Sequence, residues 1–188
     1  MNIYRFAAAL AKKIDGSHPS ARLASEAAFE RQHVIGPAWE LSRKHPEIRV
    51  FTHPENRKTT CRPTCEAAAS EFQNRVRGCP DCWEKSKAPS VVDAFGTRHN
   101  FDLVAVDRRG STLAVEVKWL RHSGGKGPNG EFQRFVGQCT LATAANDVVI
   151  GVCGFRGHRK KRFDKHEDEV KAALKKIGVR LIALRAKS

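Results

Sequence analysis

Hydrophobic residues recur along the chain with two periods, one typical of amphipathic helices and one typical of strands. Helical spacing predicts helices at residues 2–14, 20–34, 38–44, 131–145 and 163–177. Alternating or short apolar runs predict strands at residues 48–52, 101–106, 111–120, 148–155 and 179–184. This order of elements predicts an α/β (α+β) fold in which helices flank one mixed sheet.

The pattern is interrupted between residues 54 and 89, where the chain is polar, rich in cysteine and poor in branched aliphatic residues. We therefore expect three parts. Residues 1–53 supply the first helices and strand, residues 54–89 form an insertion, and residues 90–188 contain a hairpin followed by helices and strands. The hairpin turns at Asp107-Arg108-Arg109-Gly110, between two alternating runs.

Positive charge is in large excess and is unevenly distributed. The 188 residues include 34 Lys and Arg against 20 Asp and Glu, a net charge of +14. Residues 156–188 alone hold 12 basic and four acidic residues. Such an excess favours a polyanionic partner, and the basic residues expected to contact phosphates are Lys126, Arg156, Arg159, Lys160, Lys161 and Arg162. A solvated loop that keeps the protein soluble is the alternative for this cluster.

No apolar run approaches the roughly 20 residues that a membrane-spanning helix needs. The first apolar stretch, residues 6–11, is too short for a secretory signal and has its lysines on the wrong side. We therefore expect a cytoplasmic protein with no membrane partner.

Three charged residues lie within the apolar strands of the predicted hairpin. Alternation places Glu116 and Lys118 on one face of their strand, and pairing of the hairpin brings Asp102 towards them. Two carboxylates held together repel each other unless one is protonated or a cation lies between them, and a hard cation such as Mg²⁺ or Mn²⁺ suits carboxylate ligands. A solvated hairpin face is the alternative interpretation.

The spacing of Asp102 and Glu116-Val117-Lys118 resembles the Asp…Glu-x-Lys signature of the PD-(D/E)xK nuclease superfamily, with Phe101 at the proline position. The resemblance implies a restriction-endonuclease-like core of α-β-β-β-α-β order. It also implies that Asp102 and Glu116 bind Mg²⁺ or Mn²⁺, while Lys118 acts on the attacking water or on the phosphate.

Members of this superfamily also carry a glutamate on the helix before the sheet and, in some, a glutamine on the later helix. Glu26, Glu30 and Glu40 are candidates for the first, and Glu30 is chosen because it lies on the apolar stripe of its helix. Gln138 is the candidate for the second, with Gln133 as a weaker one. The alternative is that the chosen glutamate and glutamine are ordinary residues of a helix surface.

Four cysteines form two close pairs within the insertion, Cys61 with Cys65 and Cys79 with Cys82. Two such pairs can present four thiolates to one ion, which predicts a structural Zn²⁺ site; an iron–sulfur cluster and a redox pair are alternatives. Cys139 and Cys153 fall in apolar segments and are expected to be buried thiols.

Together these features predict a Mg²⁺-dependent DNA nuclease, and we expect an endonuclease. Two other classes compete with it. One is a catalytically silent DNA-binding module that keeps a nuclease-like fold, and the other is a zinc-dependent RNA-binding or regulatory protein. A homodimer would suit a nuclease that cuts both strands of a duplex, although no motif indicates one.

Overall fold

A five-stranded mixed sheet forms the centre of the computed structural model, which describes residues 1–20, 23, 25–52, 92–94, 97–99, 101–121, 129–156 and 167–186. The strands, in their order across the sheet, are β1 (Arg49–Thr52), β4 (Leu103–Val106), β5 (Thr112–Arg121), β6 (Val148–Arg156) and β7 (Val179–Arg185). The β1–β4 and β4–β5 pairs are antiparallel, whereas β5–β6 and β6–β7 are parallel.

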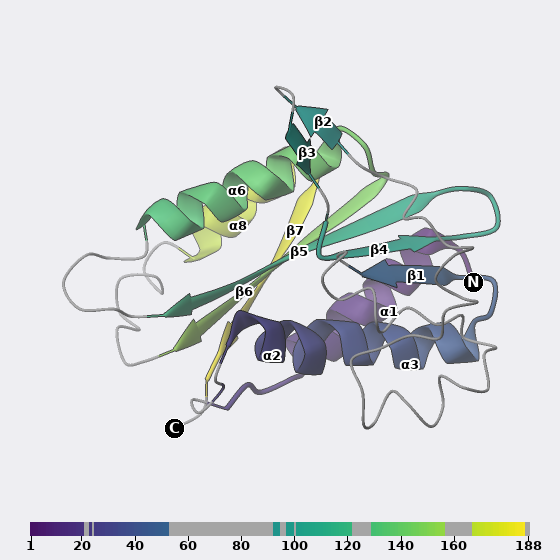
Figure 1. The fold of residues 1–188 in the computed structure, drawn as a ribbon, viewed down its shortest axis with the longest axis horizontal. Coiled ribbons are helices and arrows are strands. Elements are labelled where there is room, and N and C mark those ends of the chain that lie inside the picture. The colour runs from purple at the N-terminus through teal and green to yellow at the C-terminus, as the bar shows by residue number, and fades with distance from the viewer. Residues whose placement is uncertain are drawn as a thin grey trace.

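Helices cover both faces of this sheet (Figure 1). One layer consists of α1 (Ile3–Asp15), α2 (Glu26–Glu30), the π-helix η1 (Arg31–Ile35) and α3 (Gly36–Lys44). The other consists of α6 (Asn129–Thr143) and α8 (Glu167–Lys176). The expectation of a mixed sheet flanked by helices is therefore confirmed, while the assignment to the restriction-endonuclease-like fold stays a prediction.

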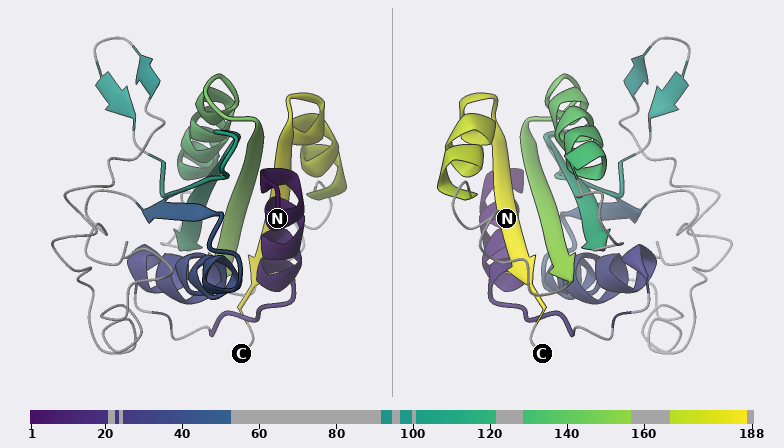
Figure 2. Two further views of the ribbon diagram at one scale, coloured as in Figure 1. Left: turned by 90° about the vertical axis from the view of Figure 1, so that its right-hand side faces the viewer. Right: turned by 90° about the vertical axis from the view of Figure 1, so that its left-hand side faces the viewer.

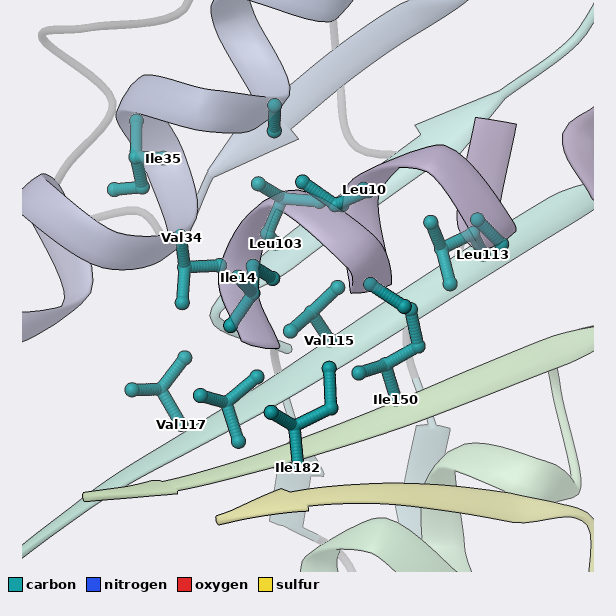
Figure 3. Close-up of a cluster of buried hydrophobic side chains, with 14 of the residues drawn as sticks. Leu10, Ile14, Val34, Ile35, Leu103, Leu113, Val115, Val117, Ile150 and Ile182 are labelled. Atoms are coloured by element: carbon teal, nitrogen blue, oxygen red, sulfur yellow. The ribbon is translucent and has the colours of Figure 1, made fainter. Parts of the chain in front are cut away.

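The core between α1 and the sheet follows from an apolar stripe at helical spacing. Ile3, Phe6, Leu10 and Ile14 are fully buried, and the Asn2 side chain caps the helix by accepting a hydrogen bond from the Arg5 amide. Figure 3 shows side chains from α1 pointing at the apolar face of β5 and β6. Burial of this stripe fixes α1 on the sheet.

The segment from Glu26 to Lys44 is continuously helical, and this corrects two expectations. The helix begins at Glu26, with Ser25 as its N-cap, rather than at residue 20, and it is not interrupted at Gly36-Pro37. Proline lacks the amide hydrogen that an α-helix needs and its ring crowds the preceding turn. The wider π-helical segment, which ends at Ile35 just before Gly36-Pro37, accommodates it.

The hairpin at Asp107-Arg108-Arg109-Gly110 is confirmed, and its strands pair with Leu103 opposite Val115. Gly110 has a φ of +85°, which favours glycine at this end of the turn. The side chain of Asp107 closes the turn by accepting hydrogen bonds from the Arg109 and Ser111 amides. The strand and helix positions predicted after the hairpin also agree with the structure within a few residues.

A second, two-stranded sheet was not predicted. It pairs β2 (Val92–Ala94) with β3 (Thr97–His99) in antiparallel register (Figure 2). The 54–89 insertion lies outside the described residues, so the proposed three-part organisation stays a prediction. In the described part of the chain, no helix has both the length and the apolar character needed to cross a bilayer.

Candidate active site at the open edge of β5

The second half of β5 has a strand on one side only within the described residues. β4 pairs with Thr112–Val115, whereas β6 follows β5 as far as Arg121. Amides two residues apart in a strand point to the same edge. At this edge the Val117 amide donates to Asp102 Oδ2 at 2.7 Å, and the Trp119 amide donates to Glu26 Oε2 at 2.9 Å. Two carboxylates therefore take the place of a neighbouring strand.

Asp102 immediately precedes β4, and Glu116 immediately follows Val115, the last residue of β5 that pairs with β4. Glu116 is almost completely buried, with 1% of its surface exposed. Burial, then the charges of Glu116 and Glu30, and more weakly that of Glu26, raise the pKa of Asp102 well above its usual range. The hydrogen bond from Val117 acts in the opposite direction without cancelling this effect.

Helix α2 supplies two glutamates at i and i+4, which places them on the same helix face. Glu30 is buried, with 6% of its surface exposed, and its charge acts on Asp102. Glu26 lies at the start of the helix, where Oε2 is 3.0 Å from the ammonium nitrogen of Lys118. The third candidate, Glu40, pairs with Lys13 in a mostly exposed salt bridge elsewhere.

An aromatic contact fixes α2 against β5. Phe29 stacks on Trp119 with the ring centroids 4.7 Å apart. Gly154 lies opposite Trp119 in the β5–β6 register, and a Cβ atom there would lie 2.4 Å from the Trp119 ring and 2.6 Å from that of Phe29. The absence of a side chain at Gly154 therefore lets both rings pack onto the sheet, and this packing determines where Glu26 and Glu30 lie.

The face of β5 that carries Glu116 and Lys118 is covered by α6. Cys139 of α6 and Cys153 of β6 are both buried there, as expected. Burial, with the nearby Glu116 and Asp102 charges, raises the pKa of the Cys139 thiol, and burial is also the main cause of the raised pKa of Cys153. Both thiols therefore stay protonated and serve as core residues.

Gln138 is on α6 and is partly exposed, next to the buried Cys139. Its catalytic role stays a prediction. Arg156 ends β6, opposite Arg121 in the register. The remaining predicted residues lie outside the described part of the chain: Cys61, Cys65, Cys79, Cys82, Lys126, Arg159, Lys160, Lys161 and Arg162.

Among the described residues, no group of three or more His, Cys, Asp or Glu side chains is arranged to hold a metal ion as it stands. In this arrangement the oxygens of Asp102 and Glu26 face N–H donors. The chemistry of the donor set nevertheless fits a hard cation, because Asp102, Glu116 and Glu30 bring only carboxylate oxygens to a buried place where their charges repel one another.

The sequence patterns did not predict that Glu26 contacts Lys118 and Trp119, or that Phe29 and Trp119 pack together over Gly154. Ser25 followed by Glu26 is an N-cap signal, which would have placed the start of the helix correctly. A glycine within the apolar run of residues 148–155 indicates a close approach to a strand.

Neither a protein-family model nor a curated protein matches the chain. One solved structure that does match is "The structure of Pyrococcus Furiosus SfsA in complex with Ca2+", with 21% identity and a TM-score of 0.29. The match covers 53% of this chain and 46% of that chain, so this protein spans less than half the length of that structure. A similarity of this extent does not assign a family or a function, so a function must be argued from the residues of the site.

Proposed function

We propose that the protein is a divalent-metal-dependent nuclease that hydrolyses phosphodiester bonds in DNA, and that it acts as an endonuclease. The observation that carries the proposal is the convergence of Asp102 and Glu116 at the open edge of β5, with Glu30 acting on Asp102. Packing several carboxylates into a buried place costs free energy, which a bound cation would recover. Lys118 lies two residues after Glu116 in β5, and therefore on the same face of the strand.

The residues of the site have distinct roles in this proposal. Asp102 and Glu116 would hold Mg²⁺ or Mn²⁺, and Glu30 would add a third carboxylate. The bound ion would polarise the scissile phosphate and lower the pKa of the attacking water. Lys118 would bring its ammonium group to the phosphate or to that water, where a positive charge stabilises the charge that develops in the transition state.

DNA is the proposed substrate because the net charge of +14 matches a polyanion and because Asp102…Glu116-x-Lys118 resembles the PD-(D/E)xK signature. The same resemblance supports a restriction-endonuclease-like fold. Phosphate contacts of this kind supply affinity without sequence readout. The basic residues of the segment after β6 are proposed to supply such contacts.

The two cysteine pairs are proposed to bind a structural Zn²⁺ ion. Four thiolates saturate a tetrahedral ion and leave no open position, so this site would stabilise the insertion and not take part in catalysis. Metal analysis of the purified protein should find about one zinc per chain, and serine at Cys61 or Cys79 should remove it. Iron in place of zinc would favour the iron–sulfur alternative.

The nuclease activity is tested by incubating the purified protein with duplex and single-stranded DNA in the presence of Mg²⁺ or Mn²⁺. We expect cleavage by the wild type and a loss of about 100-fold or more for Glu116→Gln and Lys118→Ala. Binding of DNA at low salt, measured in EDTA, should be retained by both variants. Glu40→Gln is the matched control, because it also removes the charge of a lysine-paired glutamate.

Two outcomes would contradict the proposal. Cleavage by Glu116→Gln at the wild-type rate would overturn the mechanism. DNA binding without cleavage by the wild type, with either metal, would favour the catalytically silent DNA-binding module.

A further inference from the structure

Glu26 makes three contacts with two consecutive residues of β5. Its Oε2 atom accepts a hydrogen bond from the Trp119 amide at 2.9 Å and lies 3.0 Å from Lys118 Nζ. Its Oε1 atom accepts a hydrogen bond from the same ammonium group at 3.2 Å. One carboxylate thus holds both the main chain and the Lys118 side chain at the open edge of the strand.

The position of Glu26 is itself fixed from two sides. Ser25 caps the helix through its hydroxyl, which accepts a hydrogen bond from the Ala28 amide at 3.1 Å. One turn along the helix, Phe29 stacks on Trp119. The packing of α2 therefore determines where the Glu26 carboxylate contacts β5.

Stability alone does not explain this arrangement. The side chains of Glu26 and Lys118 are 41% and 20% exposed, and salt bridges of this exposure contribute about 0–1 kcal/mol. The location of the pair is more informative. Lys118 shares a strand face with Glu116, two residues away. The charges of Glu116 and Glu30 both act on Asp102. Without Glu26, the flexible Lys118 ammonium would be drawn to these carboxylates.

We propose that Glu26 is a positioning residue that holds the Lys118 ammonium away from Asp102, Glu116 and Glu30. Held in this way, the ammonium does not compete with a divalent cation for the carboxylate oxygens and lies at the edge of the strand where a phosphate would bind. This inference rests on the proposed function. It assigns different roles to Glu26 and Glu30, which are one helical turn apart. Glu30 belongs with the carboxylates proposed to bind the cation, whereas Glu26 holds the Lys118 side chain.

The test is a double-mutant cycle on the binding of Mn²⁺ alone, measured by titration calorimetry on the full chain. Glu26→Gln keeps an oxygen that can accept the Trp119 hydrogen bond but loses the charge that holds Lys118. We expect it to weaken Mn²⁺ binding by about tenfold, because the released ammonium competes with the ion. Glu26→Gln/Lys118→Met should bind Mn²⁺ as tightly as Lys118→Met, since no competing ammonium remains.

Glu40→Gln is the matched control and should bind like the wild type. In cleavage assays Glu26→Gln should need a higher Mn²⁺ concentration for half-maximal rate, a shift that a merely structural role would not produce. Circular dichroism of each metal-free variant checks that the fold is retained.

Three results would overturn the inference. If Glu26→Gln binds Mn²⁺ like the wild type, Glu26 does not position Lys118. If Glu26→Gln/Lys118→Met binds as weakly as Glu26→Gln, the glutamate acts directly on the ion and not through the lysine. If the wild type neither binds Mn²⁺ nor cuts DNA, both the proposed function and this inference are overturned. The titration of the wild type distinguishes this result from the first two.

Discussion

The Asp102 carboxylate accepts a hydrogen bond from the amide nitrogen of Val117, 2.7 Å away. In a longer antiparallel pair this amide would bond to a main-chain carbonyl. The side chain takes that place where β4 begins, at Leu103. As a result an acidic group is fixed to the strand edge within reach of the Glu116 charge, instead of being free to turn towards solvent. The strand end and the candidate site are the same feature of the hairpin.

Replacing Asp102 by Asn should stabilise the metal-free protein at neutral and higher pH. The pKa of Asp102 is raised in the folded state, so its ionisation is less favourable there than in the unfolded chain. The stability of the wild type therefore falls as pH rises from the ordinary pKa towards the raised one. Asn is neutral and can still accept from Val117. We expect a gain of about 1 kcal/mol in the free energy of unfolding, measured by urea denaturation in EDTA at pH 8.

The effect of Asp102→Asn on stability should depend on pH and on Mg²⁺. The advantage of Asp102→Asn should shrink as pH is lowered towards the ordinary carboxyl pKa, because the wild-type Asp102 is then protonated as well. Adding Mg²⁺ should stabilise the wild type more than the variant, because only the wild type retains all the proposed ligands. A variant that is less stable than the wild type in EDTA at pH 8 would contradict the prediction.

Gly154→Ala should destabilise the fold and impair the site. The new methyl group would lie 2.4 Å from the Trp119 ring and 2.6 Å from that of Phe29, and neither ring is the flexible end of a long side chain. Overpacking of a core in this way costs about 1–3 kcal/mol. Since the two rings fix α2 on β5, we also expect weaker Mn²⁺ binding, read from the same titrations.

Gly137→Ala is the control for this substitution. Gly137 is an exposed residue of α6, and among the described residues no atom beyond its own stretch of helix backbone lies within 4 Å of the position that a Cβ would take. Alanine is favoured over glycine in a helix by about 1 kcal/mol, so thermal unfolding should occur at the same or a higher temperature. Equal stability of the two alanine variants would contradict the predicted overpacking at Gly154.

Much of the fold follows from local patterns in the sequence. The alternation in residues 111–120 separates Val115, Val117 and Trp119 from Ala114 and Leu120, and the two sets pack into different cores on opposite faces of the sheet. The turn at residues 107–110 sets the register of the hairpin, and that register brings Asp102 to Glu116. Periodicity and turn chemistry act over a few residues, which is why they can be recognised without a structure.

The roles of Glu26 and Glu30 depend on contacts that no local pattern contains. The apolar stripe correctly predicted that Glu30 faces inward. Which glutamate approaches Lys118, however, depends on the rotation of α2 about its axis, and the Phe29–Trp119 stack above Gly154 fixes that rotation across about 90 to 125 positions of sequence. The π-helical turn before Pro37 likewise replaces a break that proline would ordinarily cause.

Glu30→Gln should weaken both Mn²⁺ binding and cleavage. The substitution removes one of the charges that act on Asp102, so it should also bring the pKa of Asp102 closer to its ordinary value. We expect a loss of about tenfold or more in cleavage rate, with the folded structure retained because glutamine has the same shape. Glu40→Gln on α3 provides the comparison, and equal activity of the two variants would remove Glu30 from the site.

Asp107 links the hairpin turn to the start of α1. Its Oδ2 atom accepts from the Ile3 amide at 3.1 Å, and Oδ1 accepts from the Arg109 and Ser111 amides at 2.9 and 3.1 Å. Burial alone would raise the pKa of this carboxyl group. The three amide hydrogen bonds, with the Arg109 charge, outweigh burial and hold the pKa below its ordinary value.

Asp107→Asn should therefore destabilise the protein in a pH-dependent way. Asparagine presents only one oxygen, so its amide group would face the Ile3 N–H and lose that hydrogen bond; we expect a cost of about 1–2 kcal/mol at pH 7. A carboxyl group with a lowered pKa stabilises the fold above its ordinary pKa, and this contribution is lost as pH falls through the lowered value. The difference between wild type and variant, measured by urea denaturation from pH 7 to pH 3, should shrink below about pH 4. A difference that stays constant over this range would show that the carboxylate charge plays no part in holding α1 to the hairpin.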